Sequence, residues 1–267
     1  NGAGKSTIMN IMCGVLKQTE GDIYIKGINT RIDPVEAKCH IGFLPQQPPL
    51  HPDLTVEEYL DYSARLRYIP HKEIPAAITE VVEKCGISHF RKRLIRNLSG
   101  GYQQRVGIAQ AIIHNPDFII LDEPTNGLDP NQIVEIRNLI KQIAQERTVI
   151  LSTHILPEVQ ATCEYIYMVE KGKMVFSGTV DEFDNYILPT TIRVTLLAHP
   201  TVEELTMIPG LVAAQHLGEM DYRLQFADAR NMVDEIIETC GIHNWRLSQI
   251  YMEKSSLDVV FAELSKK

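Results

Sequence analysis

The sequence predicts an α/β fold built on a parallel sheet, followed by a smaller α+β domain. The first inference rests on short apolar segments of strand length that alternate with helical patterns. The second rests on a change near residue 190, where apolar and polar side chains begin to alternate along the chain. We therefore expect a main domain over residues 1–185 and an accessory α+β domain over residues 190–267.

The main domain is expected to begin with a helix. Residues 5–16 are rich in Ile, Met, Val and Leu and follow directly on a glycine-rich loop. A strand is expected at 21–27, between two glycines, and another at 41–44. The second strand must end at the loop 45–49, because its prolines exclude regular structure. Functional side chains often lie on such exposed loops.

A helical insertion is expected at about residues 50–115. Glu58 follows Thr55 by three residues, which is the spacing of a capping box at the start of a helix. Helical patterns continue to about Lys84, and a further helix is expected over 99–114. The remaining elements expected in the main domain are strands at 118–121 and 148–151 and a helix at 131–145.

The accessory domain mixes both types of element, which is the reason for the α+β assignment. Alternating patterns predict its strands, and apolar residues at helical spacing predict its helices. The expected strands are 190–197, 221–226 and 245–252, and the expected helices are 231–240 and 256–265.

Composition excludes several classes of protein. With 44% hydrophobic and 22% charged residues, the chain is neither disordered nor fibrous. Its 34 acidic and 26 basic residues give a net charge of −8, so we expect no nucleic acid partner. The five scattered cysteines include no C-x-x-C pair, which argues against a disulfide framework or a zinc site. A basic run at 91–96 is interpreted as a solvated edge.

The first residues indicate a phosphate-binding loop. Such a loop, G-x-x-x-x-G-K-S/T, opens a helix and directs backbone N–H groups at phosphate oxygens. Gly4, Lys5 and Ser6 match its second half; its first glycine would precede Asn1, so the sequence is expected to begin inside the motif. Lys5 would contact the β and γ phosphates, and the Ser6 hydroxyl would bind Mg²⁺. The candidate nucleotide contacts here are Asn1, Gly2, Ala3, Gly4, Lys5, Ser6 and Thr7.

Two carboxylates follow the apolar segment 118–121, namely Asp122 and Glu123. Side chains at the carboxyl end of a strand in an open parallel sheet face the ligand. We expect Asp122 to hold Mg²⁺ through water and Glu123 to act as the general base on the attacking water. The alternative is that both carboxylates belong to a solvated strand end.

A third segment, Leu98-Ser99-Gly100-Gly101-Tyr102-Gln103, precedes a predicted helix. The free N–H groups of a helix N-terminus form an anion site, although Ser99 alone could equally be a simple N-cap.

Taken together, the segments resemble the ordered motifs of the ATP-binding cassette (ABC) ATPases. Residues 98–103 resemble the signature motif, and Asp122 and Glu123 resemble its Walker B element. Gln46 is similar to the Q-loop glutamine, and His154 in Ser-Thr-His is similar to the switch histidine. Gly127-Leu128-Asp129 resembles the D-loop.

The resemblance implies a P-loop NTPase core of the ABC type with a helical subdomain. Residues 54–60, 121–130 and 256–264 are most similar to the ATP-binding subunits of ABC-2-type exporters of the multidrug and gliding-motility kind. Tyr102 stands where many family members have glutamine, although an aromatic residue is common in the export branch.

Family resemblance also implies a site completed by two subunits. Two domains would face each other head to tail and enclose two ATP molecules, each held by the P-loop of one subunit and the signature motif of the other. Asp129 would reach across the dimer, although an Asp before proline could instead be a turn or N-cap residue. The implied roles are catalysis by Gln46, Glu123 and His154, nucleotide contacts from Ser99, Gly100, Gly101, Gln103, Asp122 and Asp129, and Mg²⁺ ligation by Ser6, Gln46 and Asp122.

The implied activity is ATP hydrolysis that drives transport, with ATP and Mg²⁺ bound. The implied partners are a second nucleotide-binding subunit, in a homodimer, and a separate polytopic membrane subunit on the inner face of the plasma membrane. The alternative is a soluble ABC ATPase of translation, DNA repair or iron–sulfur assembly, which one cassette without heptads disfavours. The presence of Glu123 and His154 argues against a non-catalytic binding module. The mixture of strands and helices expected in the accessory domain argues against an importer.

Overall fold

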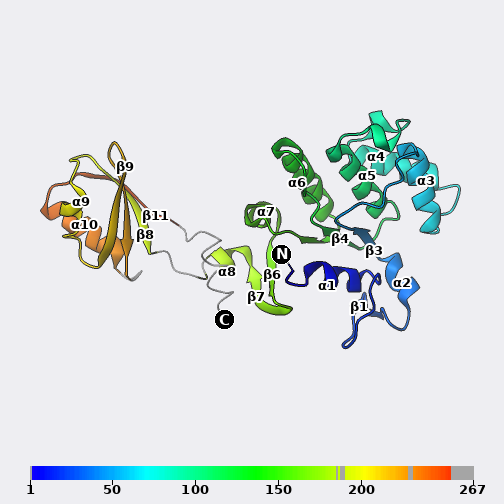
Figure 1. Cartoon of the computed structure of the whole chain (residues 1–267), viewed down its shortest axis with the longest axis horizontal. Helices are drawn as coiled ribbons and strands as arrows, with labels where there is room; N and C mark the ends of the chain where they lie inside the picture. Colours follow the sequence, from blue (N-terminus) through cyan, green and yellow to red (C-terminus); the bar gives the residue numbers. More distant parts are fainter. Residues whose placement is uncertain (1, 185, 187–189, 228–230, 254–267) are drawn as a thin grey trace. The chain divides into compact units, whose positions relative to one another are not determined.

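The computed structural model describes residues 2–184, 186, 190–227 and 231–253. The chain divides into two compact units (Figure 1). The first comprises residues 1–163 with 169–173, and the second comprises 164–168 with 174–267. The domain limits expected from the sequence, 1–185 and 190–267, stay a prediction.

A parallel three-stranded sheet forms the centre of the first unit. Strands β3 (Ile41–Leu44), β4 (Phe118–Asp122) and β5 (Thr148–Ser152) lie in the order β3-β4-β5. The expected strands are therefore confirmed, with β4 and β5 each one residue longer than expected. Strands that alternate with helices along the chain pair in parallel, as the sequence indicated.

Successive side chains of β4 point to opposite faces of this sheet, and both faces are covered. Ile119 and Leu121 pack into a core made with the helical insertion, whereas Ile120 packs with Met9 and Cys13 on the other face. In Figure 1, α1 (Lys5–Met12) lies below the sheet, and α5 (Gly100–Ile112) and α6 (Pro130–Ala144) lie above it. This two-sided burial explains why the strand reads as a continuous apolar run.

The helices of the first unit include those expected from the sequence, together with two that the sequence did not predict, at 34–39 and 156–162. The helix expected over 5–16 ends at Met12, because Gly14 adopts a left-handed φ of 64° that terminates it. The observed helices are α1, α2 (Pro34–Cys39), α3 (Val56–Leu66), α4 (Ile74–Lys84), α5 (Gly100–Ile112), α6 (Pro130–Ala144) and α7 (Leu156–Thr162), with the 3₁₀ turns η1 (Ser88–Phe90) and η2 (Ile95–Asn97).

The strand expected at 21–27 is much shorter in the structure. Only Tyr24–Ile25 forms a strand, β1, and it pairs with β2 (Ile28–Asn29) across a tight turn. Gly27 lies in that turn with a φ of 82°, so the glycine taken as the end of a strand is the turn itself.

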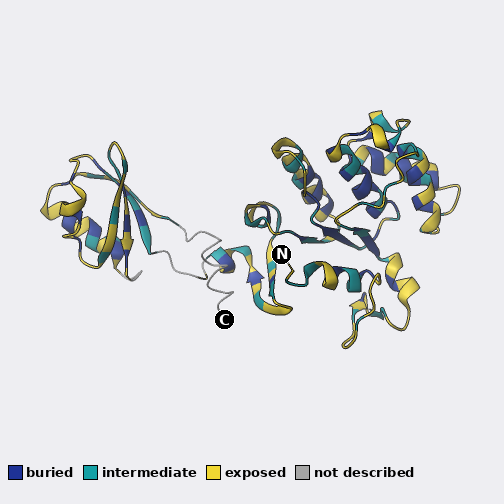
Figure 2. Ribbon diagram, in the orientation of Figure 1, coloured by how far each residue is buried: buried dark blue, intermediate teal, exposed yellow. Residues whose placement is uncertain are grey.

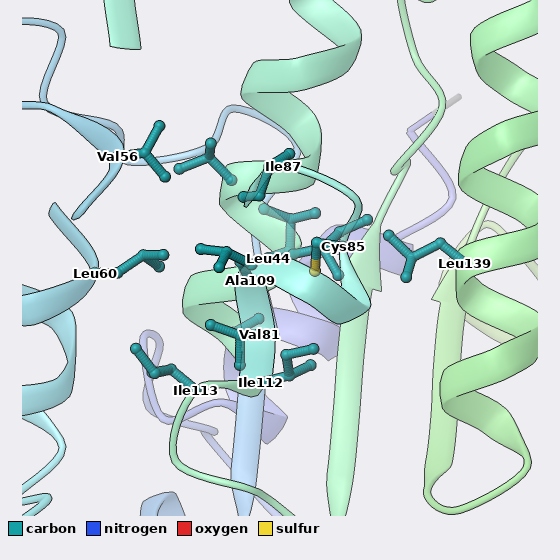
Figure 3. Close-up of a cluster of buried hydrophobic side chains, with 14 of the residues drawn as sticks. Leu44, Val56, Leu60, Val81, Cys85, Ile87, Ala109, Ile112, Ile113 and Leu139 are labelled. Carbon is teal, nitrogen blue, oxygen red and sulfur yellow. The ribbon is translucent and has the colours of Figure 1, made fainter. Parts of the chain in front are cut away.

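The helical insertion has its own apolar core. α3 begins with the expected capping box: the backbone N–H of Glu58 donates to Oγ1 of Thr55 at 3.2 Å, and the N–H of Thr55 donates to Glu58 at 2.8 Å. Figure 3 shows Leu60, Val81 and Ala109 among the side chains that fill the space between its helices. Figure 2 shows that α5 is buried along most of its length, so it is the central helix of this subdomain.

The second unit contains an antiparallel sheet of four strands. β8 (Thr191–Leu196), α9 (Val202–Leu205), β9 (Leu211–Gly218), β10 (Asp221–Phe226), α10 (Met232–Ile242) and β11 (Leu247–Glu253) follow one another, and the sheet order is β11-β8-β10-β9. This is a split β-α-β arrangement, which confirms the α+β assignment. The sequence missed β9, because its Leu-Val-Ala-Ala-Gln-His segment does not alternate. The helix expected at 256–265 lies outside the described residues.

Ahead of this sheet, β6 (Tyr165–Glu170) and β7 (Lys173–Thr179) form a two-stranded sheet that α8 (Val180–Asp184) follows. Met168 and Phe183 are the buried centre of a small apolar cluster there. Throughout the described ranges, each helix is too short or too polar to traverse a bilayer.

Candidate nucleotide-binding site

Three of the candidate segments meet at one edge of the parallel sheet. In the register of the sheet, Leu44 lies beside Leu121, and Asp122 lies beside Ser152. Gln46 follows the end of β3 by two residues and is exposed, and His154 follows the end of β5 by two residues. The carboxyl ends of neighbouring parallel strands are the usual ligand site of such a sheet.

Ser152 holds Asp122, the last residue of β4, and Glu123, which follows it, in place. Its hydroxyl donates to Oδ1 of Asp122, whose exposed fraction is only 4%. The backbone N–H of Glu123 in turn donates to the carbonyl oxygen of Ser152 at 3.1 Å and to its hydroxyl oxygen at 3.2 Å. Sequence reasoning missed Ser152; its register opposite Asp122 is the signal that would have found it.

Glu123 and His154 form a direct pair. Oε2 of Glu123 lies 3.0 Å from Nδ1 of His154, and the side chains are 12% and 44% exposed respectively. Glu123 also has a left-handed φ of 49°, a conformation that costs a non-glycine residue about 1 kcal/mol. The strained backbone turns a largely enclosed carboxylate towards an imidazole that solvent reaches.

The start of α1 has the open geometry that phosphate requires. α1 begins at Lys5, and its N-cap, Gly4, has a φ of 103° and supplies no side-chain cap. Gly2 is also left-handed, and the N–H of Gly172 donates to the carbonyl of Ala3 at 3.0 Å. The first N–H groups of the helix are therefore not capped by a side chain and can bind phosphate oxygens.

The remaining side chains of this loop agree with that reading. Ser6 and Thr7 are exposed, Lys5 is half-buried, and Asn1 lies outside the described residues. α1 also lies against β4 through Met9, which packs with Ile120. The loop is thus attached to the same strand that carries the two carboxylates.

The oxygens at this edge suit Mg²⁺ better than a metal held by protein alone. Oδ1 of Asp122 accepts from Ser152, and among the described residues no donor reaches its Oδ2. Within the described part of the chain, His, Cys, Asp and Glu side chains nowhere converge in a group of three that could hold a metal. Mg²⁺ typically takes one or two carboxylates together with phosphates and water, so Asp122 and the Ser6 hydroxyl fit it.

The start of α5 is a second uncapped helix N-terminus. Ser99 occupies the N-cap position, as one of the two alternatives had it, but its side chain makes no cap hydrogen bond, so its hydroxyl is not engaged with the start of the helix. Ser99 and Gly100 are exposed, whereas Gly101 is buried, and a Cβ at Gly101 would lie 2.6 Å from Cδ of Gln132. The glycine therefore allows α5 to approach α6 closely.

Two of the expected nucleotide contacts have partners within the chain. The amide of Gln103 donates to the carbonyls of Leu98, at 3.1 Å, and Ile95, at 3.3 Å, and so holds the turn before α5. The carboxylate of Asp129 accepts from the N–H of Gln132 at 2.9 Å and caps α6, which was one of the two alternatives for it. Contacts of Gln103 and Asp129 with nucleotide stay a prediction.

Two arginines of the basic run at 91–96 have acidic partners in the structure. Arg91 pairs with Glu57 at 2.8 Å, and Arg96 pairs with Asp53 at 2.7 Å. The guanidinium of Arg93 lies over the ring of Phe90. Two of the four basic side chains of the run are therefore held by intramolecular ion pairs.

Comparison with known proteins identifies the family. The family model described as ABC transporter matches residues 1–126. The bacitracin transport ATP-binding protein BcrA of Bacillus licheniformis is 40% identical over 66% of this chain, and the alignment spans 57% of that protein. The ABC transporter ATP-binding protein NatA of Bacillus subtilis (strain 168) is 36% identical over 68% of this chain and 74% of that protein.

A solved structure gives the same answer for the fold. The ATP-binding cassette MJ0796, solved as a dimer in a post-hydrolysis state bound to ADP and Pi, is 32% identical to this chain. The TM-score is 0.59, over 67% of this chain and 82% of that one. With the ordered motifs and the geometry of the sheet edge, these likenesses show that the chain belongs to the ABC transporter family, as one of its ATP-binding ATPase subunits.

Proposed function

We propose that this subunit hydrolyses ATP at the edge formed by β3, β4 and β5, with Mg²⁺ bound, and thereby drives export through a separate membrane protein. The observation that carries the proposal is the Glu123–His154 pair, 3.0 Å apart, beside the buried Asp122. An uncapped helix N-terminus, that of α1, packs on the same strand. A base, a cation ligand and a phosphate cradle are thus assembled from segments far apart in the sequence.

In this proposal the chain's own groups divide the chemistry. Lys5 and the first N–H groups of α1 hold the β and γ phosphates, and Ser6, Gln46 and Asp122 hold Mg²⁺, which neutralises phosphate charge. Glu123 accepts a proton from the water that attacks the γ-phosphate in line. His154 donates a hydrogen bond to that phosphate and orients Glu123 through their contact.

A second copy of the subunit completes the site. Ser99, Gly100 and Gly101 at the start of α5, of which the first two are exposed, bind the γ-phosphate held by the other copy. Two helix N-termini on opposite sides of one triphosphate neutralise charge that one of them would leave exposed. The family supports such pairing, since the cassette MJ0796 was solved as a dimer.

The helical insertion is the part proposed to meet the membrane subunit at the inner face of the plasma membrane. It follows Gln46 directly, and α3 and its end carry three exposed apolar side chains. These are Tyr62, Leu66 and Tyr68, with exposed fractions of 46%, 60% and 83%. When the two subunits close on ATP, this exposed apolar surface would move, and a membrane protein bound to it would move with it. The export assignment is supported by the likeness to a bacitracin transport protein.

Affinity purification from mildly solubilised membranes tests this proposal. The protein carries a tag, and the proteins that copurify are identified by mass spectrometry. Stoichiometric recovery of one polytopic membrane protein is the expected result. Recovery of ribosomal, DNA-repair or cluster-assembly proteins without a membrane protein would overturn the transport assignment.

A further inference from the structure

Glu158 lies at the centre of a buried cluster that the roles above do not use. It is in the first turn of α7, and its exposed fraction is 2%. Oγ1 of Thr125 lies 2.8 Å from both of its carboxylate oxygens, and Oγ1 of Thr153 lies 3.0 Å from Oε2. Nη2 of Arg137, on α6, lies 3.3 Å from Oε1.

Each group that faces this carboxylate can donate a hydrogen bond. Two hydroxyls and one guanidinium surround it, and an ionised carboxylate only accepts. A buried charge is tolerated when it is paired and hydrogen-bonded, and the cluster supplies both conditions. Glu158 therefore connects α7, α6 and two loops through directed contacts.

The two loops are those that carry the catalytic pair. Thr125 follows Glu123 by two residues, and Thr153 immediately precedes His154. The Thr153 hydroxyl also accepts the N–H of Ile155 at 3.0 Å, so both neighbours of His154 belong to this arrangement. Among the described residues, Glu158 is thus the acceptor side chain that both hydroxyls share.

We propose that Glu158 is a positioning residue for ATP hydrolysis, which sets the separation of the Glu123 carboxylate and the His154 imidazole. The inference rests on the catalytic roles proposed above for that pair. Hydrolysis requires the Glu123 carboxylate and the His154 imidazole to be aligned with the attacking water and the γ-phosphate. A displacement of about 1 Å lowers the rate roughly 100-fold. Residues that contact the reacting side chains and their loops, without touching the substrate, fix these positions.

The primary test is Glu158→Gln, which keeps the shape but removes the charge and one acceptor oxygen. The kcat for ATP hydrolysis is expected to fall at least tenfold. The KM for ATP and the ATP-dependent association of the subunit are expected to change less than twofold, because the phosphate cradle at α1 is untouched. A loss of ATP binding together with kcat would show a general structural role and overturn the proposal.

A double-mutant cycle separates positioning from a general defect. In a Glu123→Gln background no base remains to be positioned, so Glu158→Gln is expected to lower single-turnover phosphate release by much less than it does in the original protein. Equal losses in both backgrounds would overturn the proposal. Glu146→Gln is the control. It also removes the charge of a carboxylate that pairs with a basic side chain, Lys84, but Glu146 lies just after the C-terminal end of α6.

The hydroxyls provide a second, independent route if Glu158→Gln does not fold. Thr153→Val removes the hydroxyl that joins Glu158 to the His154 loop, while Thr153→Ser retains it. The valine variant is expected to lose kcat at least fivefold and the serine variant to keep turnover within twofold of the original protein. Equal turnover in the two variants would overturn the proposal.

Failure of this inference can be told from failure of the proposed function. If Glu123→Gln is inactive but Glu158→Gln and Thr153→Val turn over normally, Glu158 is not a positioning residue and the proposed function stands. If Glu123→Gln itself turns over normally, the catalytic role of the pair fails, and the inference about Glu158 fails with it.

Discussion

Nδ1 of His154 lies 3.0 Å from Oε2 of Glu123, although the two residues belong to different loops. The contact exists because β4 and β5 are neighbours in the parallel sheet and end in register, at Asp122 and Ser152. Each residue follows its strand closely, so the register of the sheet brings the two loops beside each other.

Replacing Glu123 by Gln is expected to lower ATP turnover at least 100-fold. A general base contributes about 10² to 10⁴ in rate, and an amide cannot accept the proton. ATP binding at the start of α1 should persist, so the variant is expected to remain associated in an ATP-dependent dimer. Phosphate release and size-exclusion chromatography with ATP measure the two properties.

Glu146→Gln is the appropriate control for that variant. Its carboxylate is on the exposed surface and pairs with Lys84 at 2.7 Å, away from the sheet edge. It is expected to turn over as the unmodified protein does. Normal turnover of Glu123→Gln would remove Glu123 from the role of base.

Ser152→Ala is expected to destabilise the first unit by about 1–3 kcal/mol, because Asp122 loses its buried donor. It is also expected to lower turnover, since the hydroxyl of Ser152 contacts both the Asp122 carboxylate and the backbone N–H of Glu123. Denaturant unfolding and phosphate release are the measurements.

Ser63→Ala is a matched control for the stability effect. Ser63 is also buried, and its hydroxyl donates to the carbonyl of Tyr59 within α3, at 2.8 Å. That hydroxyl serves no buried carboxylate, so a cost below about 1 kcal/mol is expected. If the two variants lose the same free energy of unfolding, the Ser152–Asp122 contact contributes no more to stability than the hydroxyl of Ser63 does.

The sequence predicts the central strands well because parallel strands buried on both faces are apolar throughout. It likewise places Asp122 and Glu123 at the end of β4, since the apolar run stops there. It does not reveal Glu158, because an acidic residue in a short helix looks like a surface residue until Thr125, Thr153 and Arg137 surround it. Such clusters depend on tertiary contacts that no local pattern records.

The same limit explains the errors among the smaller elements. The segment 21–27 has the composition of a strand, but it has too short a partner to form more than β1. β9 has no alternating pattern, because as an edge strand it needs only a few inward residues. Neighbours therefore decided these elements more than propensity did.

The two threonine N-caps allow the units to be tested separately. Thr55 and Thr201 each cap a helix through a capping box, in the first and second unit respectively. Substitution of either by alanine is expected to cost about 1 kcal/mol in its own unit. The chain's single tryptophan, Trp245, is buried in the second unit, so its fluorescence should follow Thr201→Ala and not Thr55→Ala. Identical fluorescence transitions in both variants would mean that the units unfold together.

His114 makes the stability of the first unit dependent on pH. Its Nε2 lies 3.1 Å from the carbonyl oxygen of Ile41, whereas its buried Nδ1 has no partner among the described residues. Burial, reinforced by the charge of Arg67, lowers the pKa of the His114 imidazole to about 4. In the unfolded chain the pKa of this imidazole is near 6.5. Between about pH 4 and pH 6.5, His114 is therefore protonated in the unfolded chain and neutral in the folded chain.

The sign of the effect follows from that difference. The contribution of His114 is fully present above about pH 6.5 and is lost as the pH falls towards 4, by about 1.4 kcal/mol per pH unit. Between pH 7 and pH 5 the loss amounts to about 2 kcal/mol. His114→Gln retains a donor for Ile41 but does not titrate, so its free energy of unfolding should fall by about 2 kcal/mol less over this range. Urea unfolding at both pH values measures the difference, and parallel behaviour of the two proteins would show that the pKa of His114 is not depressed.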